Sequence, residues 1–497
     1  MKVLFVSPEV SPLARTGGLG DVVGALPSAL RNTGLDIRIL CPLHRGALKG
    51  LESKRLEGSL RFRVGSRRRS CRVVETCLPR TDVPVYLLEH KGLFNRPGLY
   101  AGPRGDYQDN AERSLVLCRA ALELQVVTGW SPDVYHAHDW MAAALPAYLN
   151  AASVIENRPP SASVLTIHNL EHQGIFSSEA FALSRLPNSY FRAEGFEHYG
   201  RLNLLKGGIQ HADKITTVSP TYAEEIRSEL HGHALHPSLD FRAADLVGIL
   251  NGIDEDAWNP RDDLALPKPF CPDTVETGKQ ACRTALSKEV GLPHISSLPL
   301  FGAVSRLYWQ KGLDLLAKAL PKLLEKSDLQ LILLGSGDPA LEKKFSNLAK
   351  RFPKKIAVRI GFDDDLARRI FAASDFFVMP SRFEPCGLAQ QYAMRYGALP
   401  VARRTGGLAD TVRDPKEYPQ AANGFLFDKT TETSLAMALR QAAKIHAKPE
   451  TLARMRRNAM DRKASWKDAS DRYAEVYRWA LETRGKRLAR SSDDPCG

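Results

Sequence analysis

Residues 15–21 read Arg-Thr-Gly-Gly-Leu-Gly-Asp, and residues 404–410 repeat this stretch as Arg-Thr-Gly-Gly-Leu-Ala-Asp. Both copies precede a predicted helix, and the second closely follows a predicted strand. Chance similarity over so short a stretch is the alternative. Two domains wound in the same way, each with such a turn before a helix, explain the repeat better, and we therefore expect a chain of two similar α/β domains.

Outward from these turns, short apolar runs alternate with amphipathic stretches, a pattern typical of parallel α/β architecture. In the first half, strands are predicted at Val3–Ser7, Ile37–Cys41, Val83–Leu88, Val134–Ala137, Val164–His168, Lys214–Val218 and Leu246–Leu250, and helices at Gly20–Leu30, Ala111–Val127 and Tyr222–Leu230. In the second half, strands are predicted at Leu298–Val304, Leu329–Leu334, Ile356–Ile360, Phe376–Met379 and Leu399–Ala402, and helices at Leu313–Leu324, Leu341–Arg351, Asp364–Ala373, Leu388–Tyr396 and within Glu432–Glu482.

The two halves are separated by a stretch rich in proline, Asn259–Thr277, which has little periodicity and is typical of a linker. We predict an N-terminal Rossmann-like domain over residues 1–255, a linker over 256–277, a C-terminal Rossmann-like domain over 278–475, and a C-terminal helix with a basic tail over 476–497. The expected ligand site is a cleft between the two open sheets, at the carboxyl ends of their strands.

The composition narrows the class of protein. With 497 residues, 43% hydrophobic and 25% charged, the chain has an ordinary globular balance. Its net charge of +13 is spread along the sequence, without a nucleic-acid-binding motif, so a solvated surface or an anionic substrate explains it better than nucleic-acid binding. The eight cysteines form no CxxC pair, which favours reduced thiols in the cytoplasm, and no run is long and apolar enough to span a membrane.

Two glycine-rich turns are candidate anion sites. In Thr16-Gly17-Gly18-Leu19-Gly20, the absence of Cβ atoms lets backbone N–H groups approach a phosphate or a sugar at the start of a helix. An ordinary turn before a helix is an equally good interpretation. Gly335-Ser-Gly-Asp338 is a second candidate, for which a plain turn is at least as good an explanation.

Charged side chains follow three further predicted strands. Arg306 and Lys311 can neutralise a diphosphate leaving group, or they can be a surface pair. Glu384 lies in a tight turn where it can hold sugar hydroxyls, with free N–H groups nearby, or it can simply cap its own helix. In His136-Ala-His-Asp139, an extended backbone points the two histidines to one face and Asp139 to the other, which disfavours a metal site and suits Asp139 to a sugar or acid/base contact. His168 ends the next strand and can join the same rim, with a buried structural histidine as the alternative.

Taken together, these motifs resemble those of bacterial glycogen synthases and plant starch synthases, from Lys2 to about Ala480. The matching segments are VLFVSPEVSPLARTGGLGDVVGALP, YHAHDW, TIHN with QGIF, LLKGGIQHADKITTVSPTYAEEI, GILNGIDEDAWNP, SRLYWQKGLDLL, SRFEPCGLAQQYAMRYGALPVARRTGGLADTV and NGFLF. The resemblance implies two Rossmann-like domains of the GT-B type facing across a cleft. It also implies retaining transfer of glucose from ADP-glucose to the non-reducing end of an α-1,4-glucan (glycogen), with no metal ion or other cofactor.

The resemblance also implies roles for individual residues. Asp139, His168, Arg306, Lys311 and Glu384 would be catalytic, with the two cations on the diphosphate, Glu384 on the donor glucose, and Asp139 and His168 beside the reacting carbon. Phe362 would stack on adenine. The donor would be surrounded by Arg15, Gly17, Gly18, Asp21, Asn251, Arg306, Lys311, Phe362, Glu384, Cys386, Gly387 and Leu388, and the acceptor would meet Tyr100 and Asp139.

The sequence departs from the family pattern at three positions. Arg15 replaces the usual lysine, Ala389 the usual threonine, and Ser114 a common aromatic residue. These changes leave two alternatives to an active ADP-glucose-dependent enzyme: a non-catalytic glucan-binding or regulatory relative, and a related transferase that uses UDP-glucose. The sequence alone indicates neither the oligomeric state nor any allosteric control.

Overall fold

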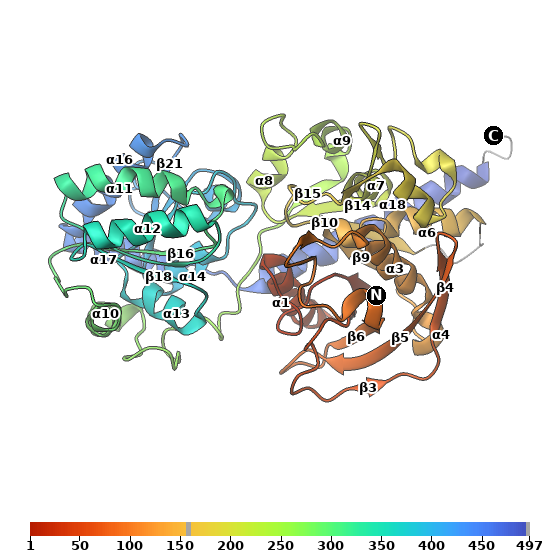
Figure 1. Cartoon of the computed structure of the whole chain (residues 1–497), viewed down its shortest axis with the longest axis horizontal. Helices are drawn as coiled ribbons and strands as arrows, with labels where there is room; N and C mark the ends of the chain where they lie inside the picture. The colour runs from red at the N-terminus through yellow and green to blue at the C-terminus, as the bar shows by residue number, and fades with distance from the viewer. Residues whose placement is uncertain (156–160, 494–497) are drawn as a thin grey trace. The chain divides into compact units, whose positions relative to one another are not determined.

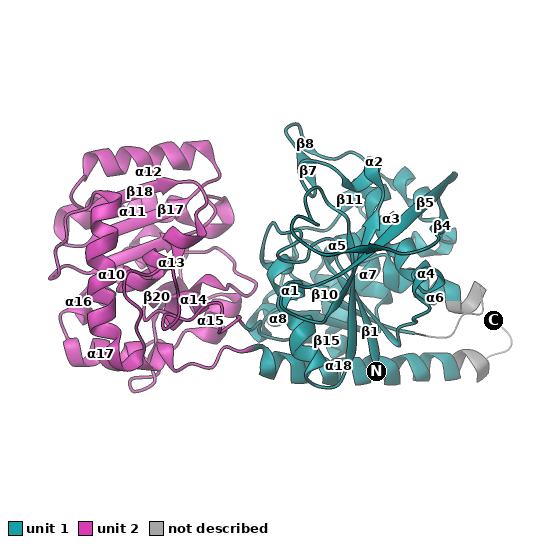
Figure 2. Ribbon diagram, turned by 90° about the horizontal axis from the view of Figure 1, so that it is seen from below, with its two compact units in different colours: residues 1–252, 466–497 teal, residues 253–465 magenta. Residues whose placement is uncertain are grey.

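The computed structural model describes residues 1–155 and 161–493. The chain forms two compact units, shown in different colours in Figure 2. Unit 1 comprises residues 1–252 together with the C-terminal segment that begins at Trp466, and unit 2 comprises residues 253–465. Each unit is built around a mostly parallel sheet with helices on its faces (Figure 1).

The sheet of unit 1 has the order β15-β14-β10-β9-β1-β2-β6-β5-β3, with β4 paired to β5. Neighbouring strands from β15 to β6 are parallel, whereas β3, β4 and β5 add an antiparallel edge. Its strands are β1 (Lys2–Val6), β2 (Asp36–Pro42), β3 (Lys54–Arg55), β4 (Leu60–Val64), β5 (Arg67–Cys77), β6 (Pro84–Glu89), β9 (Val134–His138), β10 (Ala162–Ile167), β14 (Lys214–Thr217) and β15 (Leu246–Gly248). From β1 the chain first adds β2 and β6 on one side and later β9 on the other, so the strand order reverses between β1 and β9. In open α/β sheets this reversal is where ligands bind.

Helices cover the sheet of unit 1. The helices are α1 (Gly18–Arg31), α2 (Lys91–Phe94), α3 (Asn110–Glu123), α4 (Gln125–Thr128), α5 (Asp139–Ala142), α6 (Leu145–Ile155), α7 (Leu204–His211), α8 (Pro220–Glu225), α9 (His236–Phe241) and α18 (Trp466–Asp493), with short 3-10 turns at Ser178–Ser184, Asn188–Tyr190 and Ala243–Asp245. Two small sheets complete the unit: β7 (Ala101–Gly102) with β8 (Gly105–Asp106), and β11 (Ile175–Phe176) and β12 (Glu197–His198) on either side of β13 (Arg201–Asn203). A core beneath α1 and α18 combines Val22 and Leu26 with Val476 and with Val3 and Phe5 of β1.

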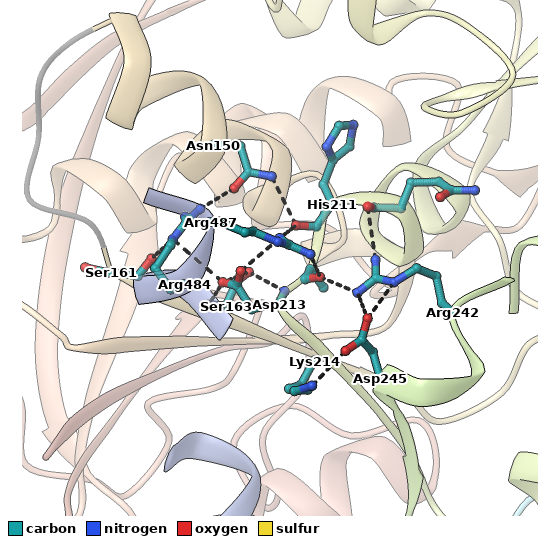
Figure 3. Close-up of polar contacts among 12 residues, drawn as sticks. Asn150, Ser161, Ser163, His211, Asp213, Lys214, Arg242, Asp245, Arg484 and Arg487 are labelled. Carbon is teal, nitrogen blue, oxygen red and sulfur yellow. Dashed lines mark hydrogen bonds and ion pairs between the residues drawn. The ribbon is translucent and has the colours of Figure 1, made fainter. Parts of the chain in front are cut away.

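A buried polar network fixes the last helix to unit 1 (Figure 3). Asp213 is fully buried, and its carboxylate accepts hydrogen bonds from the backbone N–H and hydroxyl of Ser163 at 2.8 and 3.0 Å. Arg487 of α18 pairs with this carboxylate at 2.9 Å, while Arg484 donates to the carbonyl oxygen of Ser161 at 2.9 Å. A buried charge requires such partners, so α18 is an integral part of unit 1.

Unit 2 repeats the same winding on a smaller scale. Its strand order is β18-β17-β16-β19-β20-β21, all neighbours being parallel, and the order reverses between β16 and β19. The strands are β16 (Leu300–Val304), β17 (Gln330–Gly335), β18 (Ile356–Ile360), β19 (Phe376–Met379), β20 (Leu399–Arg403) and β21 (Phe425–Phe427). The helices are α10 (Val275–Val290), α11 (Leu313–Lys326), α12 (Pro339–Arg351), α13 (Asp364–Ala373), α14 (Ala389–Arg395), α15 (Gly406–Thr411), α16 (Glu432–His446) and α17 (Pro449–Met460), with short turns at Pro272–Thr274 and Trp309–Lys311. Apolar cores lie on both faces of this sheet, which explains why its central strands β17, β16 and β19 are largely hydrophobic.

Three features differ from the sequence-based expectations. The division between the units falls at Gly252–Ile253 and again at Ser465–Trp466, so the expected domain over 278–475 is cut short and the expected C-terminal segment starts earlier and returns to unit 1. The predicted linker over 256–277 belongs to unit 2 and contains the start of α10. The antiparallel edge strand β5 is not among the predicted strands; it opens with Arg67-Arg68-Arg69, and buried residues alternate with exposed ones further along it.

Within the described residues, all cysteines are free thiols. No helix in this part of the chain is long and apolar enough to cross a membrane.

Candidate active site

In unit 1, several predicted site residues follow strands that end at the same edge of the sheet. Arg15 lies in the connection from β1 to α1, Asp21 lies in the first turn of α1, Asp139 directly follows β9, His168 directly follows β10, and Asn251 follows β15. The first three flank the β1–β9 reversal. Because parallel strands present their carboxyl ends at one edge, the fold gathers these residues as the sequence indicated.

The first glycine-rich turn is held by a carboxylate that sequence reasoning missed. Glu9 is 3% exposed, and it accepts hydrogen bonds from the backbone N–H groups of Thr16 at 2.6 Å and Gly17 at 3.3 Å. It also accepts from the hydroxyls of Thr16 at 2.5 Å and Tyr100 at 2.6 Å. Burial, followed by the charge of Glu9, raises the pKa of Tyr100 well above its ordinary value, so Tyr100 stays a hydroxyl. Glu9 stands at the carboxyl end of β1, and that position is the signal that could have identified it.

The glycines of this turn border open space. A Cβ atom added at Gly17 or Gly18 would meet no atom within 4 Å, and α1 begins at Gly18 with Gly17 as its N-cap. Arg15 lies beside them and pairs with Asp21 through Nε–Oδ1 and Nη2–Oδ2 contacts of 2.7 and 3.0 Å. The start of a 14-residue helix with an arginine next to it suits an anion. The ligand-binding interpretation therefore has the space it needs.

Asp139 occupies a strained position. Its φ angle is +55°, in the left-handed region that side chains other than glycine rarely adopt. Its carboxylate accepts the backbone N–H of His168 at 2.6 Å. Burial raises the pKa of Asp139 to about 8, and the N–H groups of His168 and Asn169 oppose this rise. The turn takes Asp139 off the strand, so the predicted alternation of faces applies to His136 and His138 alone.

The histidines next to Asp139 are buried and interconnected. His138 Nδ1 lies 3.0 Å from His168 Nε2, and the ring centroids of His136 and His138 are 4.1 Å apart. Desolvation lowers the pKa of His168 to about 3, so its ring is neutral at physiological pH. Among the described residues, no group of three His, Cys, Asp or Glu side chains is arranged to hold a metal ion.

In unit 2, two predicted residues meet at the point where the strand order reverses. Lys311 lies in the connection after β16 and Glu384 in the connection after β19. Lys311 Nζ is 2.8 and 2.7 Å from the two carboxylate oxygens of Glu384, and the hydroxyl of Ser381 donates to the same carboxylate at 3.0 Å. Glu384 is thus a buried, doubly supported carboxylate rather than a helix cap.

The glycines of the second copy of the repeat, Gly406 and Gly407, support the turn that carries Glu384. Gly407 donates its backbone N–H to the carbonyl oxygen of Glu384 at 3.1 Å, and a Cβ atom on Gly407 would lie 2.0 Å from the carbonyl oxygen of Cys386. At Gly387 the φ angle is +69° and an added Cβ would meet Gln390 at 2.4 Å. The repeated motif therefore has two different roles. In unit 1 its glycines face open space, and in unit 2 the absence of Cβ atoms lets the backbone of the Glu384 turn pack closely against it.

The remaining candidate site residues of unit 2 fall into two groups, accessible side chains and a structural turn. Phe362 is 79% exposed two residues after β18, and Arg306 is exposed two residues after β16, so both are accessible at the carboxyl edge. The Gly335–Asp338 turn is structural. A Cβ atom at Gly335 would lie 2.0 Å from the carbonyl oxygen of Ser305, and Asp338 caps α12 itself by accepting the N–H of Ala340 at 2.7 Å. The plain-turn interpretation fits this segment.

Comparison with known proteins identifies the family. Residues 2–240 match the starch synthase catalytic domain, and residues 291–462 match glycosyl transferases group 1. Glycogen synthase 2 of Geobacter sulfurreducens is 42% identical, over 97% of this chain and 100% of that protein. The chain belongs to the glycogen and starch synthase family. The predicted function of a glycogen synthase, a glycosyltransferase that uses a nucleotide-sugar donor and a glucan acceptor, is confirmed at this level.

Further members of the glycogen and starch synthase family agree. Glycogen synthase of Syntrophotalea carbinolica is 43% identical, over 97% of this chain and 99% of its own. The catalytic domain of starch synthase IV from Arabidopsis thaliana, solved bound to ADP and acarbose, has a TM-score of 0.87 at 33% identity, covering 97% of this chain and 99% of that one.

Sucrose-phosphate synthase of Thermosynechococcus elongatus, at 17% identity and a TM-score of 0.58, shares the fold. The predicted GT-B fold is confirmed.

Proposed function

We propose that this member of the family transfers glucose from ADP-glucose to the non-reducing end of an α-1,4-glucan, with retention of configuration and release of ADP. The observation that carries the proposal is the Lys311–Glu384 pair at the strand-order reversal of unit 2, where an open α/β sheet binds its ligand. A cation and an anchored carboxylate at one point suit a donor that combines a diphosphate with a sugar. The relative of known structure that was solved with ADP supports the choice of nucleotide.

In the proposed mechanism, Lys311 and Arg306 stabilise the negative charge that develops on the departing diphosphate. Glu384 accepts hydrogen bonds from donor glucose hydroxyls, and its pairing with Lys311 and Ser381 holds its carboxylate in place. Gly387 and Leu388 add backbone N–H donors, Cys386 lines the same turn, and the exposed ring of Phe362 stacks on the base.

The residues of unit 1 act on the sugar side. Arg15, Gly17 and Gly18 receive an anionic part of the donor at the start of α1. Asp139 and His168 lie beside the reacting carbon, and Asp21, Tyr100 and Asn251 line the sugar and acceptor side. The donor β-phosphate takes the proton of the acceptor hydroxyl as the glucosyl bond breaks, so the protein mainly aligns the reactants and stabilises charge. No protein nucleophile is part of this proposal.

A panel of donors tests the proposal. Purified protein is incubated with glycogen and with labelled ADP-glucose or UDP-glucose, and incorporation into glycogen is measured. We expect incorporation from ADP-glucose to exceed that from UDP-glucose. A preference for UDP-glucose would favour the related transferase, and glycogen binding without incorporation from either donor would favour the non-catalytic relative. Undiminished transfer after EDTA treatment is expected, since the proposal requires no metal ion or other cofactor.

The proposal also includes a cytoplasmic location, without a membrane or nucleic-acid partner. Bacterial relatives with glycogen synthase names support it. Fractionation of cells that express the tagged chain tests it, since we expect the activity to remain with the cytosolic fraction.

A further inference from the structure

A pair of buried histidines lies next to Asp139 in the candidate site. His138 is fully buried and His168 is 8% exposed, and a single hydrogen bond of 3.0 Å joins His138 Nδ1 to His168 Nε2. Burial lowers the pKa values of both rings, so both are neutral at physiological pH. One proton lies in this bond, and the ring that supplies it determines which nitrogen of His168 carries hydrogen.

Two arrangements satisfy the bond. If His168 Nε2 donates, His138 must carry its own proton on Nε2. If His138 Nδ1 donates, its Nε2 is left with a bare lone pair. Within the described part of the chain, His138 Nε2 is buried and has no hydrogen-bond partner. Orphaned buried N–H groups are rarer in native proteins than under-satisfied acceptors, so the second arrangement is favoured.

The ring of His138 is also closely packed, which limits its alternatives. The ring centroids of Phe5 and His136 are 4.9 and 4.1 Å from that of His138. His136 is itself fixed, because its Nδ1 lies 2.9 Å from the hydroxyl of Tyr477 in α18 and its Nε2 lies 2.6 Å from the hydroxyl of Thr166. A ring in such a setting keeps one orientation, so Nδ1 stays directed at His168.

We propose that His138 is a positioning residue that donates from Nδ1 to His168 Nε2 and so holds His168 in the tautomer with its proton on Nδ1. His168 has no other side-chain hydrogen bond among the described residues. Its Nδ1–H is therefore a donor that remains available to an oxygen atom of the substrate, such as a sugar hydroxyl or a phosphate. This inference rests on the proposed function in one respect, namely that His168 lies beside the donor sugar.

The tautomer can be read directly by NMR. The chain contains 13 histidines, and 15N-histidine labelling with long-range 1H–15N correlation distinguishes Nδ1–H from Nε2–H rings. The spectrum of His168→Gln assigns the His168 signals by their absence. We expect the Nδ1–H pattern for His168 in the full-length wild-type protein. An Nε2–H pattern for His168 would overturn the proposal, whether or not the His138 variants fold.

Two variants test the functional consequence. His138→Leu removes the donor, whereas His138→Asn retains an N–H at the same number of bonds from the backbone as Nδ1. We expect His138→Leu to lose the single Nδ1–H tautomer of His168 and to lower kcat about 10-fold, the scale of one hydrogen bond. His138→Asn should restore both the tautomer and most of kcat. Equal losses in the two variants, with His168 unchanged in both spectra, would show that His138 acts only through packing.

This experiment separates its own failure from that of the proposed function. The tautomer is measured on the free protein without any sugar nucleotide. An Nδ1–H signal in a protein that does not transfer glucose from ADP-glucose would therefore reject the proposed donor and leave the histidine arrangement standing. Normal transfer from ADP-glucose with an Nε2–H signal would instead reject the histidine arrangement and leave the proposed donor standing.

Discussion

Lys311 and Glu384 form an ion pair in which both carboxylate oxygens lie within 2.8 Å of the ammonium nitrogen, although 73 positions separate them in the sequence. The pairing depends on the winding of unit 2, because β16 and β19 become neighbours only after β17 and β18 have been added on the other side of β16. Gly312 and Pro380 show how closely the two connections approach, since a Cβ atom on Gly312 would lie 1.9 Å from the carbonyl oxygen of Pro380. The fold thus places a cation and a carboxylate together where the sequence lists them separately.

Loss of either member of this pair should impair transfer. We expect Lys311→Ala and Glu384→Ala each to lower kcat by at least ~10²-fold, the scale of losing one preorganised group. Initial rates with ADP-glucose and glycogen provide the measurement. Lys318→Ala, at an exposed position on α11, is the matched control and should keep wild-type kcat. Near-wild-type turnover in both site variants would refute the assignment of the donor site.

The pH dependence of stability should reveal Asp139. Its pKa of about 8 in the folded chain exceeds the ordinary value of about 3.9 in an unfolded chain. Between these values the folded state binds more protons than the unfolded state, so this group stabilises the fold most at low pH and the contribution is lost as the pH rises through 8. Asp139→Asn removes the titration while keeping an acceptor for the N–H of His168. In thermal melts at pH 5 and pH 9, the Tm of the variant should rise relative to that of the wild type as the pH rises. An equal change of Tm with pH in both proteins would contradict the raised pKa.

The two copies of the glycine motif should respond oppositely to alanine. In Gly407→Ala, the new Cβ would collide with the carbonyl oxygen of Cys386, so we expect a lower Tm and reduced activity. In Gly17→Ala, nothing lies within 4 Å and the backbone is extended, so Tm should stay at the wild-type value while KM for ADP-glucose rises. Calorimetry and initial rates on both variants make the comparison. A large loss of stability at Gly17 would mean that the first turn is structural.

Removal of the buried Asp213 should destabilise unit 1. Asp213→Ala leaves the buried Arg484 and the partly exposed Arg487 without their carboxylate and frees the N–H of Ser163, and breaking a buried ion pair costs about 3–5 kcal/mol. Asp240→Ala is the control, since Asp240 forms an exposed pair with Arg227 and its loss should cost no more than about 0.5 kcal/mol. Denaturant titration gives both free energies of unfolding. Equal costs would show that the network in Figure 3 contributes little.

The sequence predicted the parallel strands well because strands buried on both faces are continuous apolar runs, as in Phe376–Met379, whose bounds the structure reproduces. The bounds of Ile356–Ile360 are also reproduced, although this strand lies at the sheet edge and its second half is exposed. It predicted Lys311, Glu384, Asp139 and His168 as candidates because each closely follows such a run. Glu9 was missed, since a single acid before a loop has no spacing that shows what it binds.

The long edge strand β5 and the course of α18 could not be predicted in the same way. The alternation in Arg67–Cys77 is interrupted by two adjacent buried valines, and a run of three arginines opens it. The pattern of α18 marks an amphipathic helix but cannot indicate which sheet it covers. That choice depends on contacts such as Tyr477 with His136, between residues 341 positions apart.

The placement of α18 has a consequence for synthesis of the chain on the ribosome. Unit 2 is one continuous segment, whereas unit 1 is completed only by residues that are translated after unit 2 has emerged. Until α18 has been translated, the apolar side of α1 that packs against α18 remains uncovered, and unit 1 cannot complete its fold. We expect nascent chains that stop before Trp466 to be captured by chaperones and to be degraded readily. Unit 2 of the same chains is complete and can already be folded.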